Sequence, residues 1–102
     1  MKKLADSEVG MMLSATFEIQ FTDEAYTDYL KLDQNMTRRV NTALDTLVHN
    51  PLFGPNVRKL TGQYAGLYRY RVGRYRIIYR VDTQHYRCII RGIHQRGRAY
   101  SP

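Results

Sequence analysis

The sequence has little cysteine, no tryptophan and no long hydrophobic run. Cys88 is the only cysteine among 102 residues, so no disulfide can form within the chain, which suits a reducing cytoplasm. Because its neighbours are apolar, we interpret Cys88 as a small core residue rather than a nucleophile. No apolar stretch approaches the ~20 residues of a membrane span, and Asp6, Glu8 and Gly10 interrupt any signal-peptide core. We therefore expect a cytoplasmic protein.

Acidic side chains are nearly absent from the second half of the chain. Residues 51–102 carry eleven basic side chains and one acidic one, whereas residues 1–50 carry five basic and eight acidic. The net charge of +7 is therefore concentrated in the C-terminal half. This split predicts a surface that binds a phosphate-rich partner or an acidic protein. A solvated basic surface without a partner is the alternative.

Several motifs that carry chemistry are also missing. The sequence contains no phosphate-binding glycine loop, no Cys/His spacing of the zinc type and no recognisable Ser-His-Asp arrangement. The three histidines, His49, His85 and His94, are far apart, so we expect neither a metal site nor a cofactor. The helix dipole accounts for the three acidic residues nearest to one another, which are Asp23, Glu24 and Asp28.

The chain is long enough for one modest hydrophobic core. Residues 1–15 lack periodicity, so we predict a flexible N-terminal extension followed by a single domain over residues 16–102. Residues 16–21 alternate as a strand does, and Thr22 is a suitable N-cap for a helix that runs to about Leu32. A second amphipathic helix is predicted from near Asn35 to Asn50, where Pro51 follows.

The C-terminal half reads as strands. Residues 57–60 are compatible with a short strand, and residues 67–80 form two alternating runs that meet at Gly73, with tyrosines on one face and arginines on the other. A final strand is predicted over residues 86–94; if it is regular, His94 shares a face with Cys88 and Ile90, and Ile93 lies on the other. The predicted order is β-α-α-β-β-β. The fold class is therefore α+β, with a helical hairpin on one face of a small, mostly antiparallel sheet.

Three segments carry a resemblance to a known family. They are GLYRYRVGRYRIIYRVD (66–82), VRKLTG (57–62) and GIHQRGRAY (92–100). Together with the FEIQFTDEA opening at residues 17–25, they resemble the RelE/ParE superfamily of bacterial type II toxins. The resemblance covers nearly all of residues 16–100.

This resemblance implies two alternative activities. RelE-like members are ribosome-dependent mRNA endonucleases, whereas ParE-like members inhibit DNA gyrase without nuclease chemistry. For the first, it implies metal-independent cleavage by attack of a 2′-hydroxyl on the adjacent phosphate, with mRNA in the ribosomal A site and rRNA as partners. For either activity, it implies a cognate, RelB-like antitoxin. A basic module that binds RNA or ribosomes without catalysis is a third reading.

The resemblance also implies site residues. The candidate catalytic residues are Arg69, Arg71, Arg76, His94, Arg96 and Tyr100, and the candidate RNA-binding residues are Arg58, Lys59, Arg74 and Arg98. The best-known members carry lysines where this chain has Arg69 and Arg71. Because arginine does not deprotonate in proteins, these two side chains can grip a phosphate but cannot act as the base. His94 and Tyr100 remain as the candidate base and acid.

Overall fold

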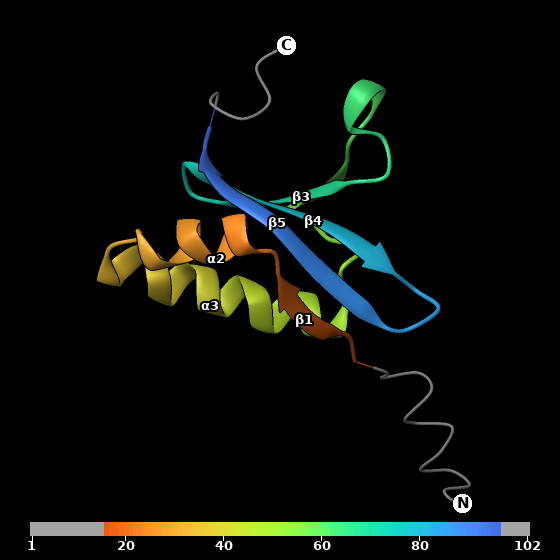
Figure 1. The fold of residues 1–102 in the computed structure, drawn as a ribbon, viewed down its shortest axis with the longest axis horizontal. Helices are drawn as coiled ribbons and strands as arrows, with labels where there is room; N and C mark the ends of the chain where they lie inside the picture. The colour runs from red at the N-terminus through yellow and green to blue at the C-terminus, as the bar shows by residue number, and fades with distance from the viewer. Residues whose placement is uncertain (1–15, 97–102) are drawn as a thin grey trace, which may run out of the picture.

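Two helices cover one face of a five-stranded sheet in the computed structural model, which describes residues 16–96 (Figure 1). In chain order the elements are β1 (Glu18–Phe21), α2 (Asp23–Leu30), α3 (Gln34–His49), β2 (Val57–Lys59), the 3-10 turn η1 (Gly62–Tyr64), β3 (Tyr68–Val72), β4 (Tyr75–Asp82) and β5 (Arg87–Gln95). The predicted N-terminal extension and the candidate site residues Arg98 and Tyr100 lie outside the described residues. No described helix is long and apolar enough to cross a membrane.

The sheet has the strand order β1-β5-β4-β3-β2. β1 runs parallel to β5, and the other three neighbouring pairs are antiparallel. The predicted α+β fold, with a helical hairpin on a mostly antiparallel sheet, is confirmed. The short segment after the helices does form a strand, β2, so four strands follow the helical hairpin.

Side-chain caps set the starts of both helices. Thr22 caps α2 as predicted, because its hydroxyl oxygen accepts a hydrogen bond from the backbone N–H of Ala25 at 3.2 Å. Asp33 caps α3 by accepting from the N–H of Met36 at 2.7 Å. The chain leaves α3 at Asn50, before Pro51. These caps determine where the two helices of the predicted hairpin begin.

The core lies between α3 and the sheet. Four residues of the predicted apolar stripe of α3 are buried, namely Met36, Val40, Ala43 and Leu47. They pack with Ile77 and Tyr79 of β4 and with Cys88 of β5. Burial raises the pKa of the Cys88 thiol to about 12, so at neutral pH this side chain is a neutral core group, as predicted.

Tyr79 ties the sheet to the segment that follows α3. Its ring is fully buried, and its hydroxyl donates to the carbonyl oxygen of Pro51 at 2.7 Å. The ring of Tyr68 stacks on it, with centroids 5.7 Å apart and an interplanar angle of 16°. Tyr68, Tyr70 and Tyr75 also pack against the core, so the hairpin tyrosines belong to the helical face as predicted.

The pairing of β4 with β5 contains an irregularity. Ile78 pairs with Gly92, but the next residue, Tyr79, pairs with Ile90, which leaves Arg91 without a partner on β4. Such a β-bulge adds one residue to one strand and reverses the alternation of faces beyond it.

The bulge corrects one prediction. A regular final strand would place His94 with Cys88 and would direct Ile93 to the opposite face. Instead, Ile93 pairs with Ile77 and is only 4% exposed in the core, whereas His94 pairs with Arg76 on the other face. The prediction was wrong because a single-residue bulge is not encoded in the period-two pattern.

We expect Tyr79→Phe to lower the free energy of unfolding by about 1–3 kcal/mol, because it leaves the carbonyl of Pro51 without this buried donor. Urea unfolding followed by circular dichroism measures the change. Tyr68→Phe is the matched control, since it removes a tyrosine hydroxyl next to the same ring. Equal stability of the Tyr79→Phe variant and the unmodified protein would contradict this account of the bond.

Candidate functional site

Cross-strand pairing gathers four arginines on the face of the sheet that the helices leave uncovered. Arg58 of β2 lies opposite Arg69 of β3, and Arg71 of β3 lies opposite Arg76 of β4. Residues directly opposite in an antiparallel pair point to the same face, with Cβ atoms about 4.5–5.5 Å apart. We call these four residues the basic face. His94 extends it to β5, because it lies opposite Arg76.

The guanidinium groups of the basic face repel one another. The pKa of Arg69 is lowered, first by partial burial and then by Arg58, Arg76 and Arg71. The pKa of Arg76 is also lowered, first by burial and then by Arg96, Arg71 and Arg58. Arginine remains protonated despite such shifts. The basic face and Arg96 therefore form one cluster of positive charge.

No carboxylate neutralises this cluster among residues 16–96, where none of its five arginines forms an ion pair. Like charges directly opposite one another destabilise a sheet. An anion that bound here would remove part of that repulsion, so the cluster is suited to a phosphate backbone or an acidic protein segment.

Arg69 is the arginine of the basic face that the fold holds in place. One of its terminal nitrogens donates to the carbonyl oxygen of Asn56 at 2.9 Å, and the residue is half-buried. Arg71, two residues along the same strand, is exposed. Arg69 is thus a positive charge held by a hydrogen bond, whereas Arg71 is exposed and open to a ligand.

Two of the remaining predicted basic residues, Arg74 and Lys59, lie outside the basic face. Arg74 lies in the turn between β3 and β4, and its carbonyl oxygen accepts from the N–H of Arg96 at 2.6 Å. This bond keeps the end of β5 beside the hairpin and brings Arg96 close to Arg76. Lys59 pairs with Tyr68, so it belongs to the helical face of the sheet and not to the basic face.

Gly73 makes the turn between β3 and β4 possible. Its φ is +59°, which side-chain-bearing residues rarely adopt, and it occupies the first central position of the two-residue turn. A Cβ there would lie 2.8 Å from a terminal nitrogen of Arg39 on α3. The turn therefore favours glycine for its backbone conformation, whereas the guanidinium of Arg39, at the end of a flexible side chain, can move away from a Cβ.

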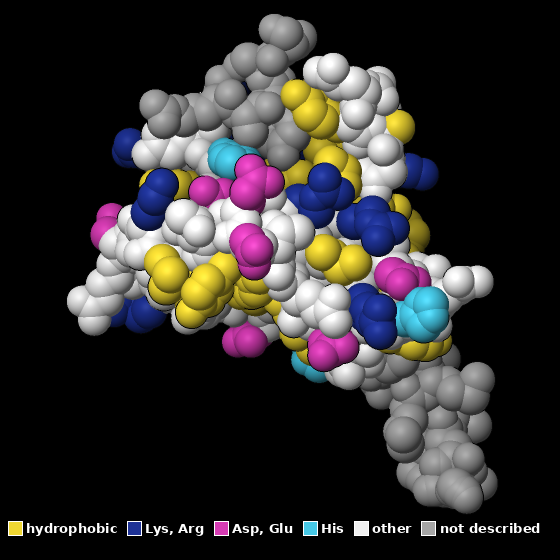
Figure 2. All heavy atoms as spheres, in the orientation of Figure 1, with side chains coloured by type: hydrophobic (Ala, Val, Ile, Leu, Met, Phe, Trp, Pro, Cys, Tyr) yellow, Lys and Arg dark blue, Asp and Glu magenta, His cyan; other side chains and the backbone are white. Residues whose placement is uncertain are grey.

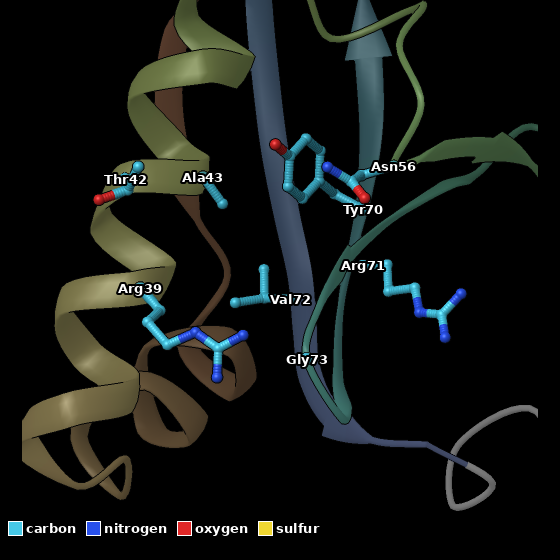
Figure 3. A pocket seen from close by; sticks show the side chains of 8 residues that line it. All are labelled: Arg39, Thr42, Ala43, Asn56, Tyr70, Arg71, Val72 and Gly73. Atoms are coloured by element: carbon cyan, nitrogen blue, oxygen red, sulfur yellow. The ribbon is translucent and has the colours of Figure 1, made fainter.

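A hollow of about 360 Å³ lies on the opposite side of β3, between that strand and α3 (Figure 3). Figure 3 shows Tyr70 and Val72 pointing towards α3, whereas Arg71 points away from it. Arg39 and Thr42 line the helix side of the hollow. This hollow opens on the helical face, and Arg71 of the basic face contributes to its rim.

His94 places an imidazole on the arginine side of the sheet. Its side chain is 36% exposed, and its Nε2 lies 3.8 Å from Oδ2 of Asp28. The same carboxylate oxygen accepts a hydrogen bond from the N–H of Ile93 at 3.1 Å. His94 thus has an accessible imidazole next to a carboxylate on one side and arginines on the other.

Sequence reasoning missed Asp28. Its place near the start of α2 suggested only a favourable interaction with the helix dipole, yet it contacts β5, 65 residues away in the chain. Figure 2 shows acidic side chains over α2 next to basic side chains over β5. No local signal in the sequence indicates this contact, because it depends on how α2 packs against β5.

Within residues 16–96, no three metal-ligating side chains converge. The candidate site brings together Arg69, Arg71, Arg76, His94 and Arg96, with Arg58 beside them. It can bind a phosphate, stabilise negative charge that develops on it, and offer one imidazole for proton transfer.

Several known proteins resemble this chain in sequence and in fold. Residues 19–99 match the family model of the ParE toxin of type II toxin-antitoxin systems, parDE. The toxin-antitoxin complex RelBE2 from Mycobacterium tuberculosis includes a chain that is 29% identical, with 80% of this chain and 100% of that chain aligned and a TM-score of 0.71. A chain of the archaeal RelE-RelB complex from Pyrococcus horikoshii is 31% identical, with 82% and 99% aligned and a TM-score of 0.68.

A third similar structure is the YoeB dimer from Staphylococcus aureus, which is 27% identical, with 78% of this chain and 97% of that chain aligned and a TM-score of 0.65. No curated protein matches the sequence significantly. The family model and the archaeal structure each align with most of the chain. This chain therefore belongs to the ParE toxin family, within the RelE/ParE superfamily of type II toxin-antitoxin systems.

Proposed function

We propose that this toxin is a metal-independent endoribonuclease that cleaves mRNA in the ribosomal A site. The observation that carries the proposal is the row formed by Arg71, Arg76 and His94 across three neighbouring strands. It combines two cations for a phosphate with one imidazole, the side chain that most often serves as a general acid or base. A surface that only binds RNA needs the cations but has no use for an imidazole beside them.

The proposed reaction is an internal transfer at one phosphate. The 2′-hydroxyl loses its proton to a base, and its oxygen forms a bond to the adjacent phosphorus. The bond between phosphorus and the 5′-oxygen of the next nucleotide breaks, and that oxygen takes a proton from an acid. The products are a 2′,3′-cyclic phosphate and a free 5′-hydroxyl. Such a step needs a base, an acid and positive charge around the phosphorane.

The residues divide these tasks. Arg76 and Arg71 stabilise the charge on the phosphorane, and Arg69 and Arg96 add to the positive potential. His94 serves as either base or acid, and Tyr100 takes the other role. Arg58, Lys59, Arg74 and Arg98 bind further phosphates of mRNA and rRNA. Since the substrate is ribosome-bound mRNA, the protein acts in the cytoplasm.

An antitoxin is the second proposed partner. The Mycobacterium tuberculosis and Pyrococcus horikoshii structures are of toxins in complex with antitoxins. We propose that a RelB-like antitoxin lays an acidic segment over the basic face of this toxin. The segment would neutralise the same arginines that grip RNA, and would thereby block the substrate.

The alternative function is inhibition of DNA gyrase without nuclease activity. The match to the ParE toxin model favours it, and one fold supports both activities. His94 beside Arg76 favours cleavage, since binding to gyrase requires no proton transfer.

We expect purified toxin to cut mRNA on programmed ribosomes. Primer extension on the recovered mRNA would show new ends within the codon that occupies the A site. Absence of new ends, alongside cleavage by a known ribosome-dependent ribonuclease, would refute the proposal. Inhibition of gyrase supercoiling by the same preparation, without RNA cleavage, would establish the alternative.

The ends of the products test the mechanism separately. Attack by the 2′-hydroxyl predicts upstream fragments that end in a cyclic or 3′-phosphate, so poly(A) polymerase should extend them only after phosphatase treatment. Downstream fragments should accept phosphate from a polynucleotide kinase directly. Fragments with a free 3′-hydroxyl would contradict 2′-hydroxyl attack.

We expect Arg76→Ala to lower the cleavage rate by about 10²–10³-fold, as the loss of one group that stabilises transition-state charge does in other enzymes. The fold should remain intact, because the substitution removes one of several mutually repelling charges. Arg80→Ala is the control, since it removes an arginine from the same strand outside the row; Arg80 is exposed, whereas Arg76 is half-buried. Equal activity of both variants would exclude Arg76 from the site.

A further inference from the structure

Three features determine where the imidazole of His94 lies. Two of them involve Asp28 and Gly92, which have no part in the proposed reaction. The first is that β5 extends beyond β1: the two strands pair only from residue 87 to residue 90 of β5. Past this point α2 takes over the free edge of β5. Asp28 accepts the hydrogen bond from the N–H of Ile93, where a neighbouring strand would otherwise accept it.

The second feature is Gly92. A Cβ at this position would overlap Nε2 of His94 and would lie 2.9 Å from its Cδ2 and 3.2 Å from its Cε1. The imidazole therefore folds back over Gly92 and occupies the space that any side chain there would need. The φ of Gly92 is outside the left-handed region, so the ring, not the backbone, requires glycine.

The third feature is the bulge at Arg91, which sets the face of both residues. Beyond it Gly92 lies opposite Ile78, and His94 lies opposite Arg76. The ring is bordered by a hollow of about 250 Å³ that Asp28, Lys31 and Tyr75 line, and by one of about 300 Å³ that Asp23 and Arg91 line. Both hollows border the imidazole, which is 36% exposed.

We propose that Gly92 and Asp28 are positioning residues for His94. Gly92 leaves the space in which the ring lies. Asp28 fixes the backbone at Ile93 and faces Nε2 of the ring, so that the imidazole keeps one orientation beside Arg76. Neither residue touches the substrate. The catalytic consequence of this arrangement rests on the proposed function.

A double-mutant cycle with Gly92→Ala and His94→Ala tests the role of Gly92. In the presence of His94, Gly92→Ala displaces the ring, so we expect cleavage to fall by about 10–100-fold. In the His94→Ala background the methyl group meets no ring, and we expect a further loss of less than about twofold. A glycine needed only for the sheet would cause the same loss in both backgrounds.

The same double-mutant cycle can be measured by urea unfolding, which does not depend on cleavage activity. The urea midpoint should fall for Gly92→Ala when His94 is present, and it should not fall when residue 94 is alanine, because glycine within a strand is less stable than alanine. In parallel, the imidazole carbon and proton resonances of His94 should shift in Gly92→Ala, whereas those of His49 and His85 should not.

Two substitutions separate the tasks of Asp28. Asp28→Asn keeps an oxygen that can accept from Ile93 but removes the charge that faces His94, whereas Asp28→Ala removes both. We expect both variants to shift the imidazole resonances and lower cleavage, with the larger loss in Asp28→Ala. Asp23→Asn is the control, because it removes a carboxylate from the same helix and the same hollow without a bond to β5. Its activity should remain within about twofold of the unmodified protein.

The two proposals fail separately. If the unmodified protein does not cleave RNA, the proposed function is refuted, while the unfolding cycle and the spectra still decide whether Gly92 and Asp28 hold the ring. Equal effects of Gly92→Ala in both backgrounds, together with unshifted His94 resonances in the Gly92 and Asp28 variants, would overturn the positioning role.

Discussion

The pairing of β4 with β5 is the constraint on which the rest of the structure depends. β4 brings Ile77 and Tyr79 to the helices and Arg76 to the opposite face, and β5 continues both surfaces. The bulge at Arg91 lets β5 place Cys88 and Ile93 in one core although they are five positions apart, a spacing that puts two residues on opposite faces of a regular strand. Without this extra residue, the isoleucine would face the arginines and the histidine would face the core.

The pairing of β4 with β5 also forms part of the basic face, whose mutual repulsion lowers the stability of the fold. Five arginines form one cluster without a carboxylate in the described part of the chain, and they repel one another. The buried stripe of α3 and the Tyr79 bond to Pro51 hold the sheet together from its other face. A core on one side and unneutralised charge on the other is an arrangement that a polyanionic partner stabilises.

The same logic connects the substrate with the proposed antitoxin. A phosphate backbone and an acidic peptide both satisfy the basic face, so they would compete for it. Charge alone would account for the proposed binding and inhibition but not for the proposed cleavage. Cleavage would also require a group that exchanges protons, and the packing of α2 against the free edge of β5 sets where the imidazole of His94 lies.

The sequence by itself determined the class of the fold and the sign of the surface. Alternation of tyrosine with arginine predicts two strands with one buried face, and the apolar stripe of α3 predicts the helix that covers it. Both patterns are local, because they repeat with the period of one strand or one helix. They also identified Arg69, Arg71 and Arg76 as neighbours on one face, which the register confirms.

Only the tertiary structure decided the surroundings of His94. A bulge of one residue reversed its face, a contact across 65 residues gave it Asp28 as a neighbour, and Gly92 gave its ring room. Lys59 also fell on the helical face, because its side follows from pairing with Tyr68. These features depend on the register between strands and on helix packing. Neither has a local signature, since each arises from residues that meet only when the chain has folded.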